Sequence, residues 1–412
     1  MQDTPRGLRL HIGIFGRRNV GKSSLINALT GQDVSIVSAI AGTTTDPVEK
    51  PIELAPVGPV VFVDTAGIDD VGALGELRRQ RTEAVMERVD LALLVVGPEG
   101  FGAFEAEVMA ALAARQTPIL VVFNKIDLVP APVGEVERLR LAGQAVVAVS
   151  ATTGINLGVL REAIITLAPD DRLAEPRLVG DLVPAGELAV LVVPIDLGAP
   201  KGRLIMPQVQ VIREILDSDA LCMVVKEREL KQALERLPSK PRLVICDSQV
   251  VLKAVADTPA DIPLTTFSIL MARFKADLVK LAAGAAAIPA LKPGDRVLIG
   301  ETCGHHPLAD DIGRVKIPRW LHQYVGGKLE IDVLAGKDFP NDLTPYSVVI
   351  HCGGCTVTRK HMLARLQRAE SQKVPMTNYG VAISLLQGVL PRALECFPAA
   401  RQAFDRAAKG PV

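Results

Sequence analysis

The chain has 412 residues, 49% of them hydrophobic, and this length exceeds what one ordinary core accommodates, so we expect roughly two to four domains. Its 46 lysines and arginines equal its 46 aspartates and glutamates, so it lacks the basic surplus typical of proteins that bind nucleic acids or anionic membranes. No apolar run approaches the roughly 18 residues of a membrane-spanning helix, and no secretory signal precedes the first strand pattern. We therefore expect a cytoplasmic protein whose six cysteines are reduced.

A phosphate-binding motif directly follows the apolar strand expected at Leu8–Phe15. Residues 16–23 read GRRNVGKS and satisfy the GxxxxGKS pattern in full. In this pattern the glycines let backbone N–H groups approach phosphate, the lysine meets the β- and γ-phosphates, and the serine hydroxyl binds Mg²⁺. A helix that begins near Lys22 adds its positive N-terminal end. The expected phosphate and Mg²⁺ contacts therefore come from Asn19, Val20, Gly21, Lys22, Ser23 and Ser24.

Later strand ends carry the remaining elements of a guanine nucleotide site. A strand at 60–63 leads into DTAG, in which Asp64 serves the metal and Gly67 meets the γ-phosphate. A strand at 119–123 leads into NKID, where the carboxylate of Asp127 can accept two hydrogen bonds that guanine offers and adenine does not. A further strand, at 146–149, brings a backbone contact to the edge of the base. These motifs predict a GTPase whose base-binding residues are Asn124, Lys125, Asp127, Ser150 and Ala151.

At these residues the chain resembles the translation-factor-related GTPases, and within them the branch that includes the tRNA-modification and ribosome-assembly GTPases. Residues 41–46, AGTTTD, match the first switch of that branch, which implies that a threonine reaches Mg²⁺ when GTP is bound; Thr44 is favoured over its competitor Thr43. Ile68 stands where many GTPases carry a water-orienting glutamine, so we expect slow hydrolysis. Asn19 matches an asparagine that helps to hold K⁺ in related proteins, and we expect K⁺ to accelerate turnover. Catalysis would depend on Lys22, Thr44, Asp64 and Gly67.

The middle of the chain shows a linker and then an alternation of strands and helices. Residues 173–187 are rich in proline, glycine and acids and lack periodicity, which indicates the linker. The strands that follow are expected at Leu188–Ile195, Leu221–Lys226, Arg242–Cys246 and Leu264–Ile269. Helical stretches between them predict a small parallel α/β layer. No catalytic constellation occurs in this part of the sequence, so we interpret it as a surface for self-association.

A second alternation, near the C-terminus, brings two thiol motifs together. One strand leads into Cys303-x-His305, and a later strand leads into His351-Cys352-x-x-Cys355. In a parallel sheet both strand ends meet at the edge where open α/β sheets bind ligands. Three cysteines with two optional histidines fit a closed zinc site or an iron–sulfur cluster with one iron left to a weaker ligand. From the residues alone both remain open, as does a thiol redox pair.

A GTPase of this branch followed by two α/β segments and a CxH…HCxxC motif resembles, along essentially the whole chain, the maturation GTPase of the iron-only (FeFe) hydrogenases. The resemblance implies a 4Fe-4S cluster on Cys303, Cys352 and Cys355, with His305 and His351 as further ligands or as neighbours of the ligands. It also implies a homodimer or larger assembly. This assembly would hold a two-iron subcluster precursor, made with two radical-SAM maturases, and deliver it to the FeFe-hydrogenase apoprotein.

The expected fold is α/β, with three domains whose sheets are largely parallel. They are a P-loop GTPase domain at 1–172, a dimerisation domain at 188–266 after the linker at 173–187, and an iron–sulfur domain at 267–412. The expected function is a GTP-hydrolysing scaffold for H-cluster assembly, with GTP or GDP, Mg²⁺, K⁺ and a 4Fe-4S cluster as cofactors. The alternative is an RNA- or ribosome-associated GTPase with a structural zinc. Zero net charge and few aromatic side chains weigh against that alternative.

Overall fold

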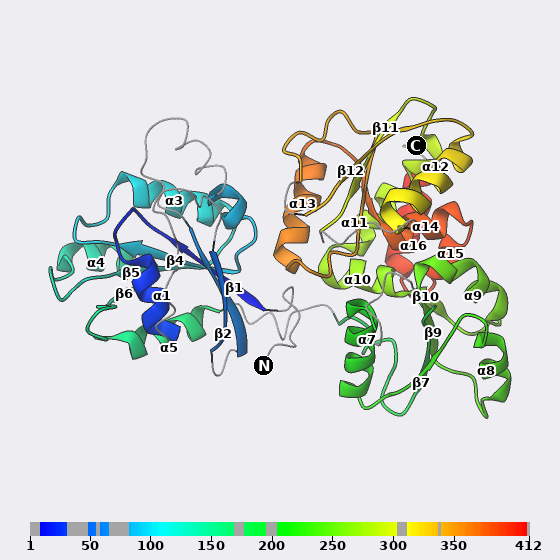
Figure 1. Cartoon of the computed structure of the whole chain (residues 1–412), viewed down its shortest axis with the longest axis horizontal. Coiled ribbons are helices and arrows are strands. Elements are labelled where there is room, and N and C mark those ends of the chain that lie inside the picture. The colour runs from blue at the N-terminus through cyan, green and yellow to red at the C-terminus, as the bar shows by residue number, and fades with distance from the viewer. Residues whose placement is uncertain are drawn as a thin grey trace. The chain divides into compact units, whose positions relative to one another are not determined.

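The computed structural model describes residues 9–30, 48–54, 58–65, 82–168, 177–194, 204–302, 311–336 and 339–409 (Figure 1). The chain divides into two compact units, Met1–Ala174 and Glu175–Val412. Both units are built from largely parallel sheets covered by helices, so the predicted α/β class is confirmed. Across these described ranges, none of the helices has the length and apolar character that crossing a bilayer would need.

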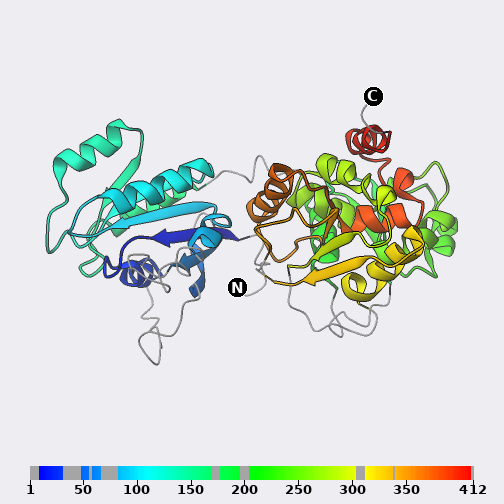
Figure 2. The same cartoon turned by 90° about the horizontal axis from the view of Figure 1, so that it is seen from above.

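The first unit is a six-stranded sheet with helices on both faces (Figure 2). Its strand order is β2-β3-β1-β4-β5-β6, in which β2 pairs antiparallel with β3 and the other pairs are parallel. The strands are β1 (Leu10–Phe15), β2 (Val48–Leu54), β3 (Gly58–Asp64), β4 (Leu91–Val96), β5 (Ile119–Phe123) and β6 (Ala145–Ala148). The helices are α1 (Lys22–Thr30), α3 (Ala103–Ala114), α4 (Val133–Leu141) and α5 (Leu157–Leu167).

Two hydrophobic clusters hold this first sheet between its helices. On one face Leu25 of α1 and Ile164 of α5 pack against alternate strand residues, and on the other face Leu112 of α3 and Leu139 of α4 do the same. Every residue of β4 is buried, which explains why this strand reads as a continuous apolar run. The polar residues that follow such strands are therefore confined to the edge of the sheet where the strands end.

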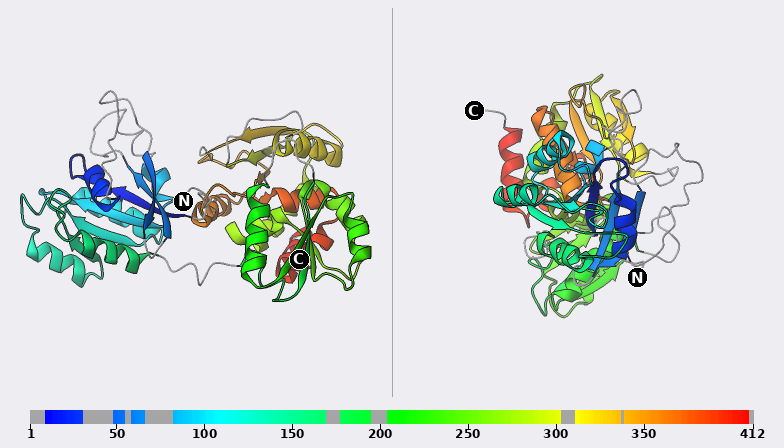
Figure 3. Two further views of the ribbon diagram at one scale, coloured as in Figure 1. Left: turned by 60° about the horizontal axis from the view of Figure 1, so that its bottom comes forward. Right: turned by 90° about the vertical axis from the view of Figure 1, so that its left-hand side faces the viewer.

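The second unit contains two four-stranded sheets in which all pairs are parallel (Figure 3). The first sheet, in the order β10-β9-β7-β8, consists of β7 (Leu188–Val192), β8 (Leu221–Val225), β9 (Leu243–Cys246) and β10 (Leu264–Thr266). The second, in the order β12-β11-β13-β14, consists of β11 (Arg296–Gly300), β12 (Glu330–Leu334), β13 (Val348–His351) and β14 (Met376–Asn378).

The helices of the second unit connect these strands and cover the sheets. The longer ones are α7 (Met206–Asp217), α8 (Leu230–Arg236), α9 (Val251–Asp257), α10 (Phe267–Lys275), α11 (Leu278–Ala285), α12 (Ile317–Val325), α13 (Arg359–Ser371), α14 (Tyr379–Leu386) and α16 (Pro398–Ala408). The short ones are η2 (Ser248–Val250), η3 (Ile288–Ala290), the π-helical η4 (Ile312–Lys316) and α15 (Leu390–Ala393).

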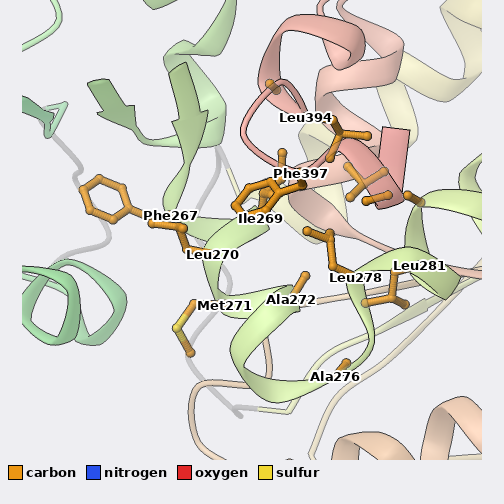
Figure 4. Close-up of a cluster of buried hydrophobic side chains, with 14 of the residues drawn as sticks. Phe267, Ile269, Leu270, Met271, Ala272, Ala276, Leu278, Leu281, Leu394 and Phe397 are labelled. Carbon is orange, nitrogen blue, oxygen red and sulfur yellow. The ribbon is translucent and has the colours of Figure 1, made fainter. Parts of the chain in front are cut away.

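The two sheets of the second unit share their hydrophobic core. One buried cluster joins residues of β7 and β9 to residues of β11, β13 and α14, and another is centred on α10 and α11. Figure 4 shows this second cluster, in which Leu278 and Leu281 of α11 lie near Leu394 and Phe397. Gly284 of α11 packs directly on β14, because a Cβ there would lie 2.0 Å from the carbonyl oxygen of Met376. The division of this unit into two domains stays a prediction.

Side-chain caps set two helix boundaries, and the first differs from the predicted end of a strand. The strand predicted at 264–269 ends at Thr266, whose hydroxyl accepts a hydrogen bond from the backbone N–H of Ile269 and starts α10. The Asp277 side chain caps the next helix, α11, by accepting from the backbone N–H groups of Val279 and Lys280. Strong apolar character alone did not indicate where the strand became a helix.

Part of the predicted linker packs onto the second unit. Leu178 and Val183 are buried in its core, and the Glu214 carboxylate accepts hydrogen bonds from the backbone N–H groups of residues 178, 179 and 180. These contacts fix the described segment 177–187 to helix α7. The apolar residues among the prolines and glycines therefore serve the core of the second unit.

The two sheets of the second unit are copies of one topology. In each sheet the strand that comes first along the chain lies between the second and the third. The fourth strand pairs with the third and forms one edge of the sheet. The registers also agree, because Val192 pairs with Val225 and Cys246 in one sheet, while Gly300 pairs with Leu334 and His351 in the other. The second unit is thus a tandem repeat, and positions in one copy have defined equivalents in the other.

Candidate nucleotide and metal sites

The backbone of the phosphate loop adopts conformations that its sequence makes possible. Gly16 and Gly21 have φ values of 148° and 92°, and Asn19 has a φ of 61°. A Cβ on Gly16 would lie 2.4 Å from the carbonyl oxygen of Val95, so the approach of β4 excludes any side chain there. The Nζ atom of Lys22 donates to the carbonyls of Gly16 and Arg17, at 2.8 and 2.7 Å. The loop therefore wraps around the lysine that the motif assigns to phosphate.

Two predicted Mg²⁺ ligands meet beside this lysine. The Ser23 hydroxyl donates to the Asp64 carboxylate at 2.9 Å, which joins the first turn of α1 to the end of β3. Burial raises the pKa of Asp64, and the hydrogen bond from Ser23 and the charge of Lys22 act in the opposite direction. A hydroxyl and a carboxylate are the hard oxygen donors that Mg²⁺ takes, so this pair fits the ion.

Asn124 ties the base-binding motifs to the phosphate loop. Its side-chain Nδ2 donates to the carbonyl of Val20 at 2.9 Å, and its Oδ1 accepts from the backbone N–H of Ala151 at 3.1 Å. A Cβ on Gly21 would lie 2.4 Å from this Nδ2 atom, so the glycine makes room for the amide. Asp127 remains exposed at the same edge of the sheet, where its carboxylate can meet a base.

The structure adds one loop contact that the motif did not predict. Arg17, inside the phosphate loop, forms an ion pair of 2.8 Å with Glu105, whose side chain is 1% exposed. The same carboxylate accepts from the backbone N–H of Gly102, at the start of α3. The loop is therefore anchored to α3 as well as to β1. The only sequence signal for this contact was the position of Glu105, three residues after Gly102, where a glutamate can cap the start of a helix.

Several predicted site residues lie outside the described parts of the chain. They are Thr44, Gly67, Cys303 and His305. The proposed roles of these four residues in catalysis and metal binding stay predictions. The remaining predicted site residues are described, and the structure places them at two sheet edges, one in each unit.

The CxxC motif follows β13 in a tight loop. Gly354 has a φ of 64°, and a Cβ there would lie 2.6 Å from the sulfur of Met362 on α13. Burial raises the pKa of Cys355 to about 11, with a further contribution from Cys352, while the charge of Lys275 lowers the pKa. In the described ranges no group of three or more Cys, His, Asp or Glu side chains lies close enough to hold a metal ion.

Thr302, just after the end of β11, contacts the CxxC motif. Its backbone N–H lies 3.3 Å from the sulfur of Cys352, its hydroxyl lies 3.4 Å from the same sulfur, and Thr356 donates to that hydroxyl at 3.1 Å. Since Thr302 directly precedes Cys303 in the chain, the strand end that leads to the first motif touches the second motif. Donors aimed at a sulfur suit a thiolate that ligates a metal, so these residues fit the predicted centre.

His351 is fully buried and both of its ring nitrogens are engaged. Nε2 lies 2.7 Å from the Arg365 guanidinium, and Nδ1 lies 2.8 Å from the carbonyl oxygen of Cys352. Burial and the charge of Arg365 lower the pKa of His351 to about 3, against the opposing hydrogen bond to Cys352. The neutral ring thus accepts from Arg365 and donates to Cys352. In this arrangement His351 fixes the thiol loop, and its nitrogens are turned to other partners.

A second buried polar group that sequence reasoning missed lies beside Cys352. Glu301, 3% exposed, accepts hydrogen bonds from the Tyr379 hydroxyl at 3.3 Å and from the Arg314 guanidinium at 3.4 Å. Gly313 permits this contact, because its Cβ would collide with both the tyrosine and the carboxylate. Burial raises the pKa of Tyr379 well above its usual value, with Cys352 and Glu301 adding to the effect. The sequence did not predict the contact between Glu301 and Tyr379, because 78 residues separate them.

The fold and nucleotide motifs of the first unit define a P-loop GTPase domain. A family model described as a 50S ribosome-binding GTPase matches residues 11–125. The tRNA modification GTPase MnmE of Bordetella parapertussis is 42% identical over 164 residues, which cover 39% of this chain and 34% of that protein. GTPase Der of Campylobacter jejuni is 38% identical over 169 residues, 38% of this chain and 36% of that protein. The chain spans about a third of the length of these curated relatives.

The second unit identifies the family. The hydrogen maturase F dimerization domain model matches residues 178–276, and the hydrogen maturase F tetramerization domain model matches residues 279–396. These two segments make up more than half of the chain, which therefore belongs to the hydrogen maturase F family. This confirms the resemblance to the hydrogenase maturation GTPases.

The chain is also similar to solved structures of GTP-binding proteins. The G domain of the T. maritima FeoB iron transporter is 23% identical, covers 39% of this chain and 99% of its own, and has a TM-score of 0.31. Era in complex with MgGDPNP and a segment of 16S ribosomal RNA is 22% identical, covers 57% of this chain and 92% of its own, and has a TM-score of 0.35.

Replacing Asn124 with alanine should weaken GDP binding by roughly 30- to 1,000-fold. The change removes the partners of Val20 and Ala151, at a cost of about 1 to 2 kcal/mol for each lost hydrogen bond. Titration with a fluorescent GDP analogue measures the affinity. Asn156→Gly is the control, because this exposed asparagine also donates to a carbonyl and its φ of 60° suits glycine. Equal losses in both variants would contradict a specific role for Asn124.

Proposed function

We propose that this chain is a slow, Mg²⁺-dependent GTP hydrolase and a scaffold for H-cluster assembly. It carries a 4Fe-4S cluster on Cys303, Cys352 and Cys355, holds the two-iron subcluster precursor, and delivers it to the FeFe-hydrogenase apoprotein. Two radical-SAM maturases supply that precursor. The observation that carries the proposal is the contact between Thr302 and Cys352, which joins the ends of β11 and β13. This contact places the strand end before Cys303 against the CxxC loop.

At the nucleotide site, each proposed step has a residue that can perform it. Lys22 lies over the phosphate loop and would bind the β- and γ-phosphates, while Ser23 and Asp64 would hold Mg²⁺. Thr44 would complete the metal shell and Gly67 would meet the γ-phosphate. Asn124 keeps the base-binding and phosphate-binding loops in one fixed arrangement.

At the thiol site, the described residues hold the loop that carries two of the proposed ligands. A bound 4Fe-4S cluster with three cysteines would supply one iron whose remaining ligand can be exchanged. The backbone N–H of Thr302 donates to the sulfur of Cys352 and would donate in the same way to a metal-bound sulfur. His351 and Arg365 hold the carbonyl of Cys352, so the loop keeps its conformation when the sulfur binds metal. The alternative, a ribosome-associated GTPase, would instead hold one structural zinc here.

Self-association is supported by the edge of the first repeat. Strand β8 ends its sheet and lies within the segment matched by the dimerization model. Its Leu221 and Val224 are 59% and 46% exposed. By register, the position of Leu221 corresponds in the other repeat to Glu330, a charged residue that pairs with Arg296. Charge at a sheet edge prevents strand pairing, and its absence at Leu221 leaves β8 able to pair with a second copy.

Hydrolysis of GTP should be about tenfold or more faster in KCl than in NaCl, because a K⁺ ion beside the phosphates would stabilise the developing charge. The measurement is phosphate release at matched ionic strength. In Asn19→Gly this preference should disappear, since the variant loses the carboxamide while its backbone φ of 61° remains accessible to glycine. Equal rates of the unaltered protein in both salts would exclude a K⁺ role.

The anaerobically reconstituted protein should be brown, contain four irons and four sulfides per chain, and lose this colour in Cys352→Ala. Metal analysis and visible absorption measure the outcome. Cys246→Ala is the control, because this buried thiol occupies the equivalent strand end of the other repeat and should leave the cluster intact. A colourless protein with one zinc per chain would refute the cluster and support the alternative function.

A Leu221→Glu substitution should break the dimer contact and halve the mass measured by light scattering. The carboxylate would face a second copy of β8, where it could not be solvated. Leu252→Glu is the matched control, because Leu252 is 53% exposed on α9 and lies outside the sheet edge. An unchanged mass for Leu221→Glu would place the interface elsewhere.

A further inference from the structure

The side chain of Arg17, in the phosphate loop, is enclosed by the first turn of α3. Its Nη2 atom donates to the Glu105 carboxylate at 2.8 Å, and its Cζ atom lies 5.8 Å from the centroid of the Phe104 ring. A Cβ on Gly102 would lie 2.6 Å from Nη2, so a side chain at that position would push the guanidinium away from the carboxylate. A carboxylate, an aromatic face and a missing side chain thus form a receptor for one arginine.

Parallel pairing brings this turn next to the phosphate loop. Strands β1 and β4 are neighbours in the sheet, so the loops that follow them leave the same edge. A Cβ on Gly97, directly after β4, would lie 3.1 Å from the Cγ1 atom of Val20 in the phosphate loop. The two loops therefore pack against each other before α3 begins, and Arg17 reaches the first turn of that helix.

The turn that receives Arg17 is held by other contacts as well. Glu105 accepts a second hydrogen bond, from the backbone N–H of Gly102 at 2.8 Å. The backbone N–H of Phe101 donates to the Glu135 carboxylate of α4 at 3.1 Å, and α3 itself packs on the sheet through its buried residues. A carboxylate that is fixed in this way can fix its partner, because neither the helix nor the turn yields to the arginine.

Arg17 also contacts the lysine that the motif assigns to phosphate. Its carbonyl oxygen accepts from the Nζ atom of Lys22 at 2.7 Å, beside the carbonyl of Gly16 at 2.8 Å. The side chain of Arg17 is therefore bound to α3 while its carbonyl is bound to the lysine. Fixing the far end of the side chain reduces the conformations open to the backbone of Arg17, and so restricts where the ammonium group of Lys22 lies.

We propose that Arg17 and Glu105 are positioning residues for nucleotide binding, which hold the Lys22 ammonium group where it meets the β- and γ-phosphates. The inference rests on the GTPase part of the proposed function, deepens it, and is independent of the metal centre. Without the pair, the phosphates would have to order the loop themselves, at the expense of binding energy. Once nucleotide is bound the lysine is in place, so the loss should appear in KM and not in kcat.

The test compares full-length Arg17→Met and the double variant Arg17→Met, Glu105→Gln with the unaltered protein. Arg17→Met alone leaves the buried carboxylate without this cation, so its melting temperature should fall. In the double variant glutamine keeps an acceptor for Gly102 without the charge, and the melting temperature should largely recover. In both variants KM for GTP and Kd for a fluorescent GDP analogue should rise about tenfold or more, while kcat changes less than about threefold.

Arg115→Met is the control, because Arg115 lies at the other end of α3 and donates to the carbonyl of Ala111. It should leave KM unchanged. A double variant that regains both the melting temperature and the KM of the unaltered protein would overturn the inference, since the pair would then only stabilise the fold. A fall in kcat at unchanged KM would overturn it as well. If the unaltered protein binds no GDP analogue, the proposed GTPase function fails, and the inference fails with it.

Discussion

The thiol site depends on one backbone hydrogen bond, from the N–H of Cys352 to the carbonyl of Gly300, at 2.8 Å. It continues the parallel pairing of β11 and β13 by one residue beyond the strand, so Thr302 reaches the sulfur of Cys352. In the other repeat Asp247 donates to Val192 in the same manner, at 3.1 Å. The same backbone geometry thus holds Asp247 in one copy and Cys352 in the other. The two loops therefore differ in which side chain they present, a carboxylate or a thiol.

The two sheets of the second unit also differ in the residues that they place at equivalent positions. Each copy has an edge strand, a loop after its third strand and a capped helix after its fourth. The first copy keeps an apolar edge at β8, where charge is absent at Leu221, and the second copy carries charged residues on β12. The second copy places the thiols of Cys352 and Cys355 in its loop, where the first copy has Asp247 and η2.

Much of the nucleotide site could be predicted from sequence, because its elements are local. The phosphate loop needs glycine at position 21, where φ is 92°, and at position 16, where β4 approaches closely. Both glycines belong to one motif of eight residues, so the sequence pattern reveals them. The contact between Arg17 and Glu105 escaped prediction, since 88 residues separate the pair and either residue alone is ordinary. Boundaries near Thr266 were also missed, because a threonine can continue a strand or cap a helix, and the surrounding core decides between them.

The sequence by itself determined the class of the nucleotide site, through motifs that few other functions require: the GxxxxGKS loop and the NKID motif. Tertiary structure alone decided which side chains surround the nucleotide and thiol sites. Parallel pairing brought Thr302 to Cys352, and burial turned the nitrogens of His351 toward Arg365 and the thiol loop. The physical reason is that charge and hydrogen bonding act through space, over a few ångströms, between residues that the sequence separates by tens of positions.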